Sequence, residues 1–88
     1  MERGRAKKFL GYIASNVRRQ RMRMGITQEK LAELASLEPS FVQKVERGIV
    51  NLSLEALVGV ADALDTTPAN LLRRATPIPR PVGRPKGK

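Results

Sequence analysis

The fold is decided by residues 27–48, which read TQEKLAELASLEPSFVQKVERG. Thr27 can cap a helix, because its hydroxyl can accept a hydrogen bond from an unpaired amide of the first turn. Apolar residues then recur at helical spacing, at Leu31, Ala32, Leu34 and Ala35. This pattern stops at residues 36–38, so the first half of the stretch predicts one short helix.

A second short helix is predicted to begin at Pro39, because proline fits the first turn of a helix, where its missing amide costs nothing. Its apolar face continues through Val42, Val45 and Ile49, and Gly48 supplies a C-terminal stop. Helices this short do not fold alone and need packing from outside. The pair is therefore predicted to form a helix-turn-helix.

Three further helices are predicted around this pair. The first covers residues 9–24, where the apolar residues on one face are Leu10, Ile13, Val17 and Met24. The fourth follows Ser53, a suitable N-cap, and its apolar stripe is Leu54, Leu57, Val58, Ala61 and Leu64. Thr67 followed by Pro68 is a helix-start signature, so the fifth helix is predicted over residues 68–74.

The predicted architecture is an all-α, compact five-helix domain over residues 9–75. Residues 1–8 are predicted to be a basic N-terminal arm. Residues 76–88 carry four of the six prolines and four of the 17 lysine and arginine side chains, with no acidic residue, so we expect a disordered basic tail.

The composition favours a binding protein over an enzyme. The chain has 88 residues, no cysteine and no histidine, which removes disulfides, thiolate metal sites and the usual general base. We therefore expect no catalytic residue, no metal and no cofactor. No apolar run approaches the roughly 20 residues of a membrane helix, and we expect a cytoplasmic, nucleoid-associated protein. The net charge of +9 favours a polyanionic partner.

The segments TQEKLA and FVQKVERG resemble the lambda-repressor and Cro type of DNA-binding domain, also called the XRE family. The resemblance covers residues 17–72. It is carried by Arg21, Gln28, Leu31, Ala32, Leu37, Val42, Val45, Glu46, Gly48 and Ser53. One departure is Ser36, which stands where the family usually has glycine at the turn, so some strain is expected there.

The resemblance implies that residues 39–47 form the recognition helix, which lies in the major groove of DNA. The predicted base-reading residues are Pro39, Ser40, Gln43 and Lys44. Serine can bond either base type, glutamine can bond adenine through two contacts, and lysine can donate to guanine. Glu38 is predicted to cap this helix with its side chain, and Phe41 to lie at the edge of the core.

Phosphate contacts are predicted around the recognition helix, at Thr27, Gln28, Arg47, Asn51 and Arg18. In the family, a glutamine at the position of Gln28 bonds a phosphate, and a helix N-terminus also favours an anion because it carries unpaired donors.

A structural ion pair is predicted between the first and third helices. Arg21 lies in the apolar stripe of the first helix and needs a partner, because a buried unpaired charge is costly. The resemblance supplies Glu46 as that partner.

The fifth helix carries Leu71 and Leu72, and Val60 and Leu52 are apolar residues left over from the predicted stripes. Family members commonly dimerise through this end. The resemblance therefore implies a homodimer that presents two recognition helices about 34 Å apart to a palindromic operator. The alternative is a monomer in which these residues complete the core.

The tail contains Gly83, Arg84 and Pro85, followed by Lys86. This run resembles the core of an AT-hook, which lies in the minor groove of A·T-rich DNA. The alternative is a solvated basic tail that adds non-specific affinity.

The leading functional hypothesis is a sequence-specific regulator of transcription that binds double-stranded DNA. The alternative is an antitoxin-type or other protein-interaction module, in which the recognition helix would not carry the function.

Overall fold

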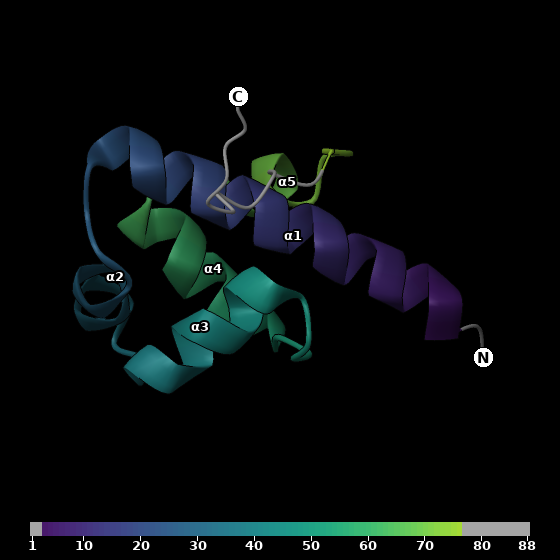
Figure 1. Cartoon of the computed structure of the whole chain (residues 1–88), viewed down its shortest axis with the longest axis horizontal. Coiled ribbons are helices and arrows are strands. Elements are labelled where there is room, and N and C mark those ends of the chain that lie inside the picture. The colour runs from purple at the N-terminus through teal and green to yellow at the C-terminus, as the bar shows by residue number, and fades with distance from the viewer. Residues whose placement is uncertain (1–2, 77–88) are drawn as a thin grey trace, which may run out of the picture.

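The computed structural model describes residues 3–76, which form helices and connecting turns without a strand. The helices are α1 (Arg3–Met24), α2 (Gln28–Ala35), α3 (Pro39–Arg47), α4 (Leu54–Ala63) and α5 (Pro68–Leu71). In Figure 1 the long helix α1 crosses the molecule, with α3 on one side of it and α5 on the other, and it contacts both. The predicted all-α, five-helix class is confirmed.

Three helix starts follow the capping signals in the sequence. The hydroxyls of Thr27, Ser53 and Thr67 each accept from the backbone amide three residues later, at 2.9, 3.0 and 3.1 Å. Each bond satisfies one of the amides that a helix start leaves unpaired. Glu38 precedes α3 but makes no side-chain capping bond, so the prediction that it caps α3 is wrong. Its side chain is longer than those of the residues that cap well, and Pro39 already removes one unpaired amide.

Two predicted boundaries are corrected by the structure. Helix α1 begins at Arg3 rather than at residue 9, so residues 3–8 continue the helix. Alanine, arginine and lysine in this segment are good helix formers, and no proline or cap separates them from the rest of α1. Helix α5 ends at Leu71 rather than residue 74. The carbonyls of Leu71, the last residue of α5, and of Arg73, beyond it, accept from the side-chain amide of Asn16, at 2.9 and 2.8 Å.

The core draws on all five helices. Its buried members are Ile13, Val17, Leu31, Ala32, Val42, Val45, Leu57, Val60, Ala61, Leu64 and Leu71. Most of these residues belong to the predicted apolar stripes. Phe41 packs against the core from its edge, as predicted, and Ile26 does so too.

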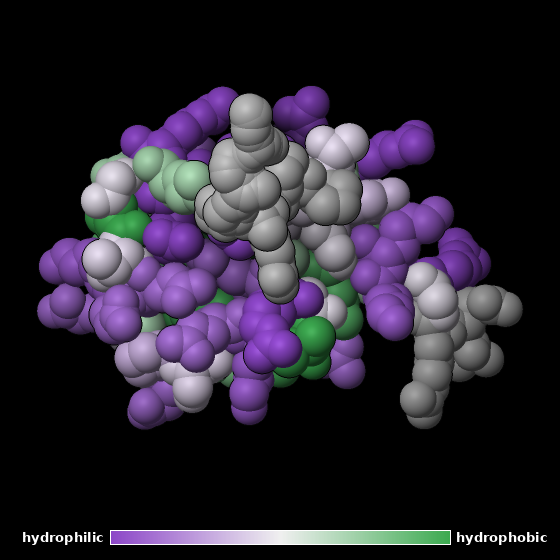
Figure 2. All heavy atoms as spheres, in the orientation of Figure 1, coloured by the Kyte–Doolittle hydropathy of each residue, from purple (hydrophilic) through white to green (hydrophobic). Residues whose placement is uncertain are grey.

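The predicted stripes are nevertheless wider than the core. Met24, Leu34, Ile49, Leu54 and Val58 were expected on apolar faces but are exposed, and Leu54 keeps 73% of its surface accessible. Each lies at the flank of a stripe or at a helix end, and a domain this small leaves such positions uncovered. On the face that Figure 2 shows, apolar residues form small, separate areas among largely hydrophilic side chains.

Two of the four residues that were expected at a dimer interface belong to the core instead. Val60 and Leu71 are each 1% exposed, and Leu52 packs partly against the core. Of the predicted dimer set, only Leu72 lies at the surface. Val60 and Leu71 therefore complete the core of one chain, which was the alternative to a role in a dimer interface.

The corner between α2 and α3 turns at Ser36, whose φ of 59° lies in the left-handed region. An L-residue other than glycine is strained there by about 1–2 kcal/mol. Gly48 closes α3 with a φ of 72°, which glycine adopts without that penalty. It also lies against α1, since a Cβ on Gly48 would stand 3.8 Å from the Cα of Gly11.

Candidate nucleic-acid interface

Helix α3 presents one polar face to solvent while its other face is buried. Val42 and Val45 anchor the inner face in the core. The exposed residues of the outer face are Pro39, Ser40, Gln43, Lys44 and Arg47. All the predicted base-reading residues are therefore brought together on one accessible surface.

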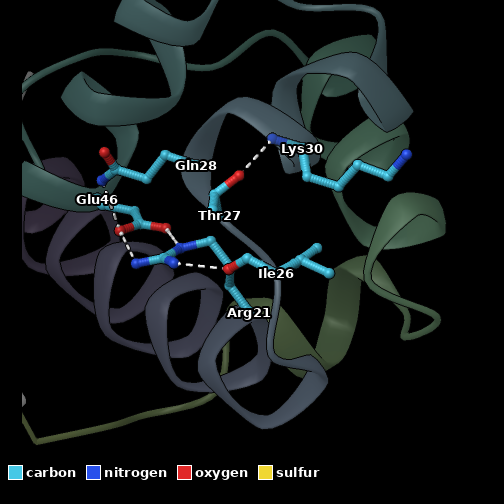
Figure 3. Close-up of polar contacts among 6 residues, drawn as sticks. All are labelled: Arg21, Ile26, Thr27, Gln28, Lys30 and Glu46. Atoms are coloured by element: carbon cyan, nitrogen blue, oxygen red, sulfur yellow. Dashed lines mark hydrogen bonds and ion pairs between the residues drawn. The ribbon is translucent and has the colours of Figure 1, made fainter.

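Helix α3 is held to α1 by the predicted ion pair between Arg21 and Glu46. The Arg21 guanidinium donates from Nε to Oε2 of Glu46 at 2.6 Å and from Nη2 to Oε1 at 3.1 Å. Its Nη1 also donates to the Ile26 carbonyl at 2.9 Å, so the guanidinium lies between α1, the following turn and α3 (Figure 3). The side chains are only 16% and 3% exposed, respectively. Two parallel contacts to one carboxylate fix orientation as well as distance.

Gln28 extends this network to α2. Its Nε2 donates to Oε1 of Glu46 at 3.0 Å, so one carboxylate receives donors from both α1 and α2 (Figure 3). The sequence reasoning missed this bond, because a glutamine amide has many possible partners and its spacing selects none of them. The phosphate contact of Gln28 stays a prediction. The side-chain carbonyl oxygen of Gln28 cannot donate to a phosphate, so the second hydrogen of its side-chain amide is the available donor.

The start of α2 offers further donors beside α3. The Thr27 oxygen accepts from the Lys30 amide, which leaves the hydroxyl hydrogen to be donated elsewhere. Within the part of the chain that the structure describes, the backbone amides of Gln28 and Glu29 have no hydrogen-bond partner. Such unpaired amides suit a phosphate.

The remaining predicted phosphate contacts are arranged differently. Arg47 and Asn51 are exposed at the end of α3 and in the loop that follows. Arg18 is half-buried on α1, and its Nε is shielded from solvent without a hydrogen-bond partner among residues 3–76. A phosphate contact from Arg18 would therefore use its terminal nitrogens. The predicted minor-groove run, residues 83–86, lies outside the described residues.

The charges of the outer face are available for an external partner. Among the described residues, neither Lys44 nor Arg47 forms an ion pair with a carboxylate. The same part of the chain has no cluster of three potential metal-ligating His, Cys, Asp or Glu side chains. No helix in residues 3–76 is long and apolar enough to cross a membrane.

Comparison with known proteins places this geometry among helix-turn-helix proteins. The helix-turn-helix family HTH_3 matches residues 17–71. The control protein C.SmaI from Serratia marcescens is 39% identical over 62 residues, which cover 70% of this chain and 74% of C.SmaI.

Solved structures resemble the chain to a similar extent. The restriction-modification controller protein C.AhdI from Aeromonas hydrophila matches with a TM-score of 0.68 at 40% identity, over 70% of this chain and 94% of C.AhdI. The clp gene regulator ClgR from Corynebacterium glutamicum matches with a TM-score of 0.69 at 30% identity, over 73% of this chain and 68% of ClgR.

Proposed function

This chain belongs to the helix-turn-helix family of DNA-binding transcriptional regulators, and we propose that it reads its operator by placing α3 in the major groove. The observation that carries the proposal is the held polar face of α3. Its inner side is fixed by core packing and by the bonds from Arg21 and Gln28 to Glu46. A helix held by several contacts can present its outer side chains to base edges at a defined register, and this register gives direct readout its selectivity.

Ser40, Gln43 and Lys44 are the proposed base-reading side chains, and Pro39 sits beside them at the start of α3. A glutamine amide matches the donor and acceptor of adenine, and a lysine ammonium matches the acceptors of guanine. Pro39 has no amide hydrogen to donate, so its contribution would be an apolar contact. This set is proposed because its members are exposed on one face.

Contacts that position the protein on the phosphate backbone are proposed on both sides of this face. Arg47 and Asn51 lie at the end of α3, and Thr27 and Gln28 lie at the start of α2. Arg18 would contribute through its terminal nitrogens. Such contacts fix register and add salt-dependent affinity without reading sequence.

We propose that the regulator acts as a homodimer on a palindromic site, with half-sites about 34 Å apart. The support is apolar surface on α4 and beyond α5, where Leu54, Val58 and Leu72 are exposed. We propose a regulatory protein without an enzymatic activity, which works at the nucleoid. Because C.SmaI and C.AhdI are named as a control protein and a restriction-modification controller, control of a restriction-modification system is the proposed biological role.

Selection of bound sites from random duplexes tests the proposal. The wild-type chain should enrich paired half-sites, whereas Gln43→Ala should fold normally and lose discrimination at one base pair by about 1–3 kcal/mol. Lys30→Ala is the matched control, because Lys30 lies on α2 and pairs with Glu33. Equal retention of every duplex sequence would refute base reading and favour the alternative of a protein-interaction module.

A further inference from the structure

A cavity of about 240 Å³ lies on the opposite side of α1 from the recognition helix. Its walls come from α1, the turn after α4, and α5 with the short segment that follows it. The polar residues that matter here are Asn16, Arg19, Gln20, Arg23, Thr66 and Arg73. None of them belongs to the proposed DNA interface.

The position of the cavity follows from helix geometry. Successive residues of an α-helix are about 100° apart, so Arg19 and Arg23 each point about 160° away from Arg21. Arg21 faces α3 through Glu46. The two cavity arginines therefore face away from α3, in agreement with the placement of α3 and α5 on opposite sides of α1 in Figure 1.

The cavity gathers positive charge that no carboxylate balances. Within residues 3–76, none of Arg19, Arg23 and Arg73 forms an ion pair. The one hydrogen bond that these three side chains make there is long, from Nη2 of Arg19 to the Thr76 carbonyl at 3.5 Å. Positive side chains that lie close together repel one another, and a bound anion would offset this repulsion.

The walls of the cavity are built before any ligand arrives. The side-chain amide of Asn16 donates to the carbonyls of Leu71 and Arg73, and that of Gln20 donates to the Leu64 carbonyl at 3.0 Å. These bonds hold the turn after α4 and the end of α5 against α1. The Thr66 hydroxyl oxygen accepts from the side-chain amide of Asn70 at 3.2 Å, so its hydroxyl hydrogen remains to be donated.

We propose that this cavity binds the phosphate group of a small phosphorylated molecule. The planar guanidinium groups of Arg19, Arg23 and Arg73 match phosphate oxygens through paired contacts, and the Thr66 hydroxyl supplies a further donor. The volume is just below that of typical small-ligand pockets, about 300–1,000 Å³. Because the recess faces away from α3, duplex DNA held at the recognition helix is not its ligand. The inference does not depend on the operator-reading role.

The test uses the full chain and sodium pyrophosphate as the probe, at constant ionic strength. In a titration followed by two-dimensional ¹H–¹⁵N correlation NMR, the chemical shifts of the side-chain amides of Asn16 and Gln20 should change and reach saturation. Arg23→Gln should raise the Kd for pyrophosphate about tenfold, the loss of one charge-assisted hydrogen bond. Arg5→Gln, which removes the same charge from an exposed site elsewhere on α1, should leave the Kd unchanged.

Several outcomes would overturn the proposal. One is a shift that never saturates, and another is an equal loss of affinity in Arg5→Gln. Malonate, a dicarboxylate, should bind at least about tenfold more weakly, because it lacks the third oxygen on each anionic group; equal binding would refute the phosphate assignment. A thermal melt verifies folding, and Arg73→Gln replaces Arg23→Gln if the latter does not fold.

Binding to a mixed-sequence duplex separates a small ligand from the DNA backbone. Arg23→Gln should bind the duplex no more weakly than Arg5→Gln does. A larger loss in Arg23→Gln would mean that the arginines hold DNA phosphates, which contradicts a small-molecule site.

Discussion

Replacing Arg21 with alanine should reduce the free energy of unfolding by about 3 kcal/mol or more, because it leaves the buried Glu46 carboxylate without its main partner. In the intact protein Glu46 accepts two hydrogen bonds from Arg21 and one from Gln28. The variant keeps only the bond from Gln28. The Glu46 side chain is only 3% exposed in the intact protein, so the lost donors can be replaced only by water that enters the space left by Arg21.

The expected loss is large for a domain of this size. Small domains have a free energy of unfolding of about 5–15 kcal/mol. A loss of 3 kcal/mol should lower the midpoint of thermal unfolding by about 12–24 °C. Glu46→Ala should cost less, since Arg21 is 16% exposed and keeps the Ile26 carbonyl as an acceptor.

Thermal unfolding followed by circular dichroism at the helix signal measures this effect. Lys30→Ala is the control, because the pair that it breaks with Glu33 is exposed and such pairs contribute about 0–1 kcal/mol. Combining Arg21→Met with Glu46→Leu should recover much of the loss, as replacement of both charges by apolar groups is often neutral. An unchanged midpoint for Arg21→Ala would refute the reasoning.

Three further predictions follow from the same structure. Ser36→Gly should raise the free energy of unfolding by about 1 kcal/mol, because glycine adopts the positive φ without strain; a lower melting midpoint would contradict it. Thr27→Ala should lower that free energy by about 1 kcal/mol through loss of the α2 cap, and an unchanged urea midpoint would argue against the cap. Arg47→Ala should weaken binding to all duplexes alike and reduce the salt slope of log K by about 1. Fluorescence anisotropy at several salt concentrations measures that slope, and a loss confined to one sequence would make Arg47 a base reader instead.

The features that the sequence predicted well are those with local causes. The caps at Thr27, Ser53 and Thr67 depend on bonds to amides three residues away, and residue type is sufficient to expect them. The partner of Arg21 is different. The position of Arg21 in an apolar stripe indicated that it needs a negatively charged partner. Only the resemblance to a known family selected Glu46, which lies 25 positions further along the chain.

The features that the sequence did not predict depend on distant contacts. Periodicity marks a helical face but not how much of it the neighbouring helices cover, so Leu34 and Val58 belong to the predicted apolar stripes although both are exposed. The bonds from Asn16 to the end of α5 join residues 55 and 57 positions apart. No spacing rule links them, and the cavity that they border was not foreseen.

The residues that hold α3 in place differ from those that its outer face exposes, and this separation affects how such a protein can acquire new DNA sites. Val42, Val45 and Glu46 keep the helix in place, whereas Ser40, Gln43 and Lys44 make no hydrogen bond or ion pair through their side chains within residues 3–76. Substitutions at these three positions should therefore retune the preferred half-site with little change in stability. A library randomised only at residues 40, 43 and 44 should yield many folded variants with divergent binding preferences.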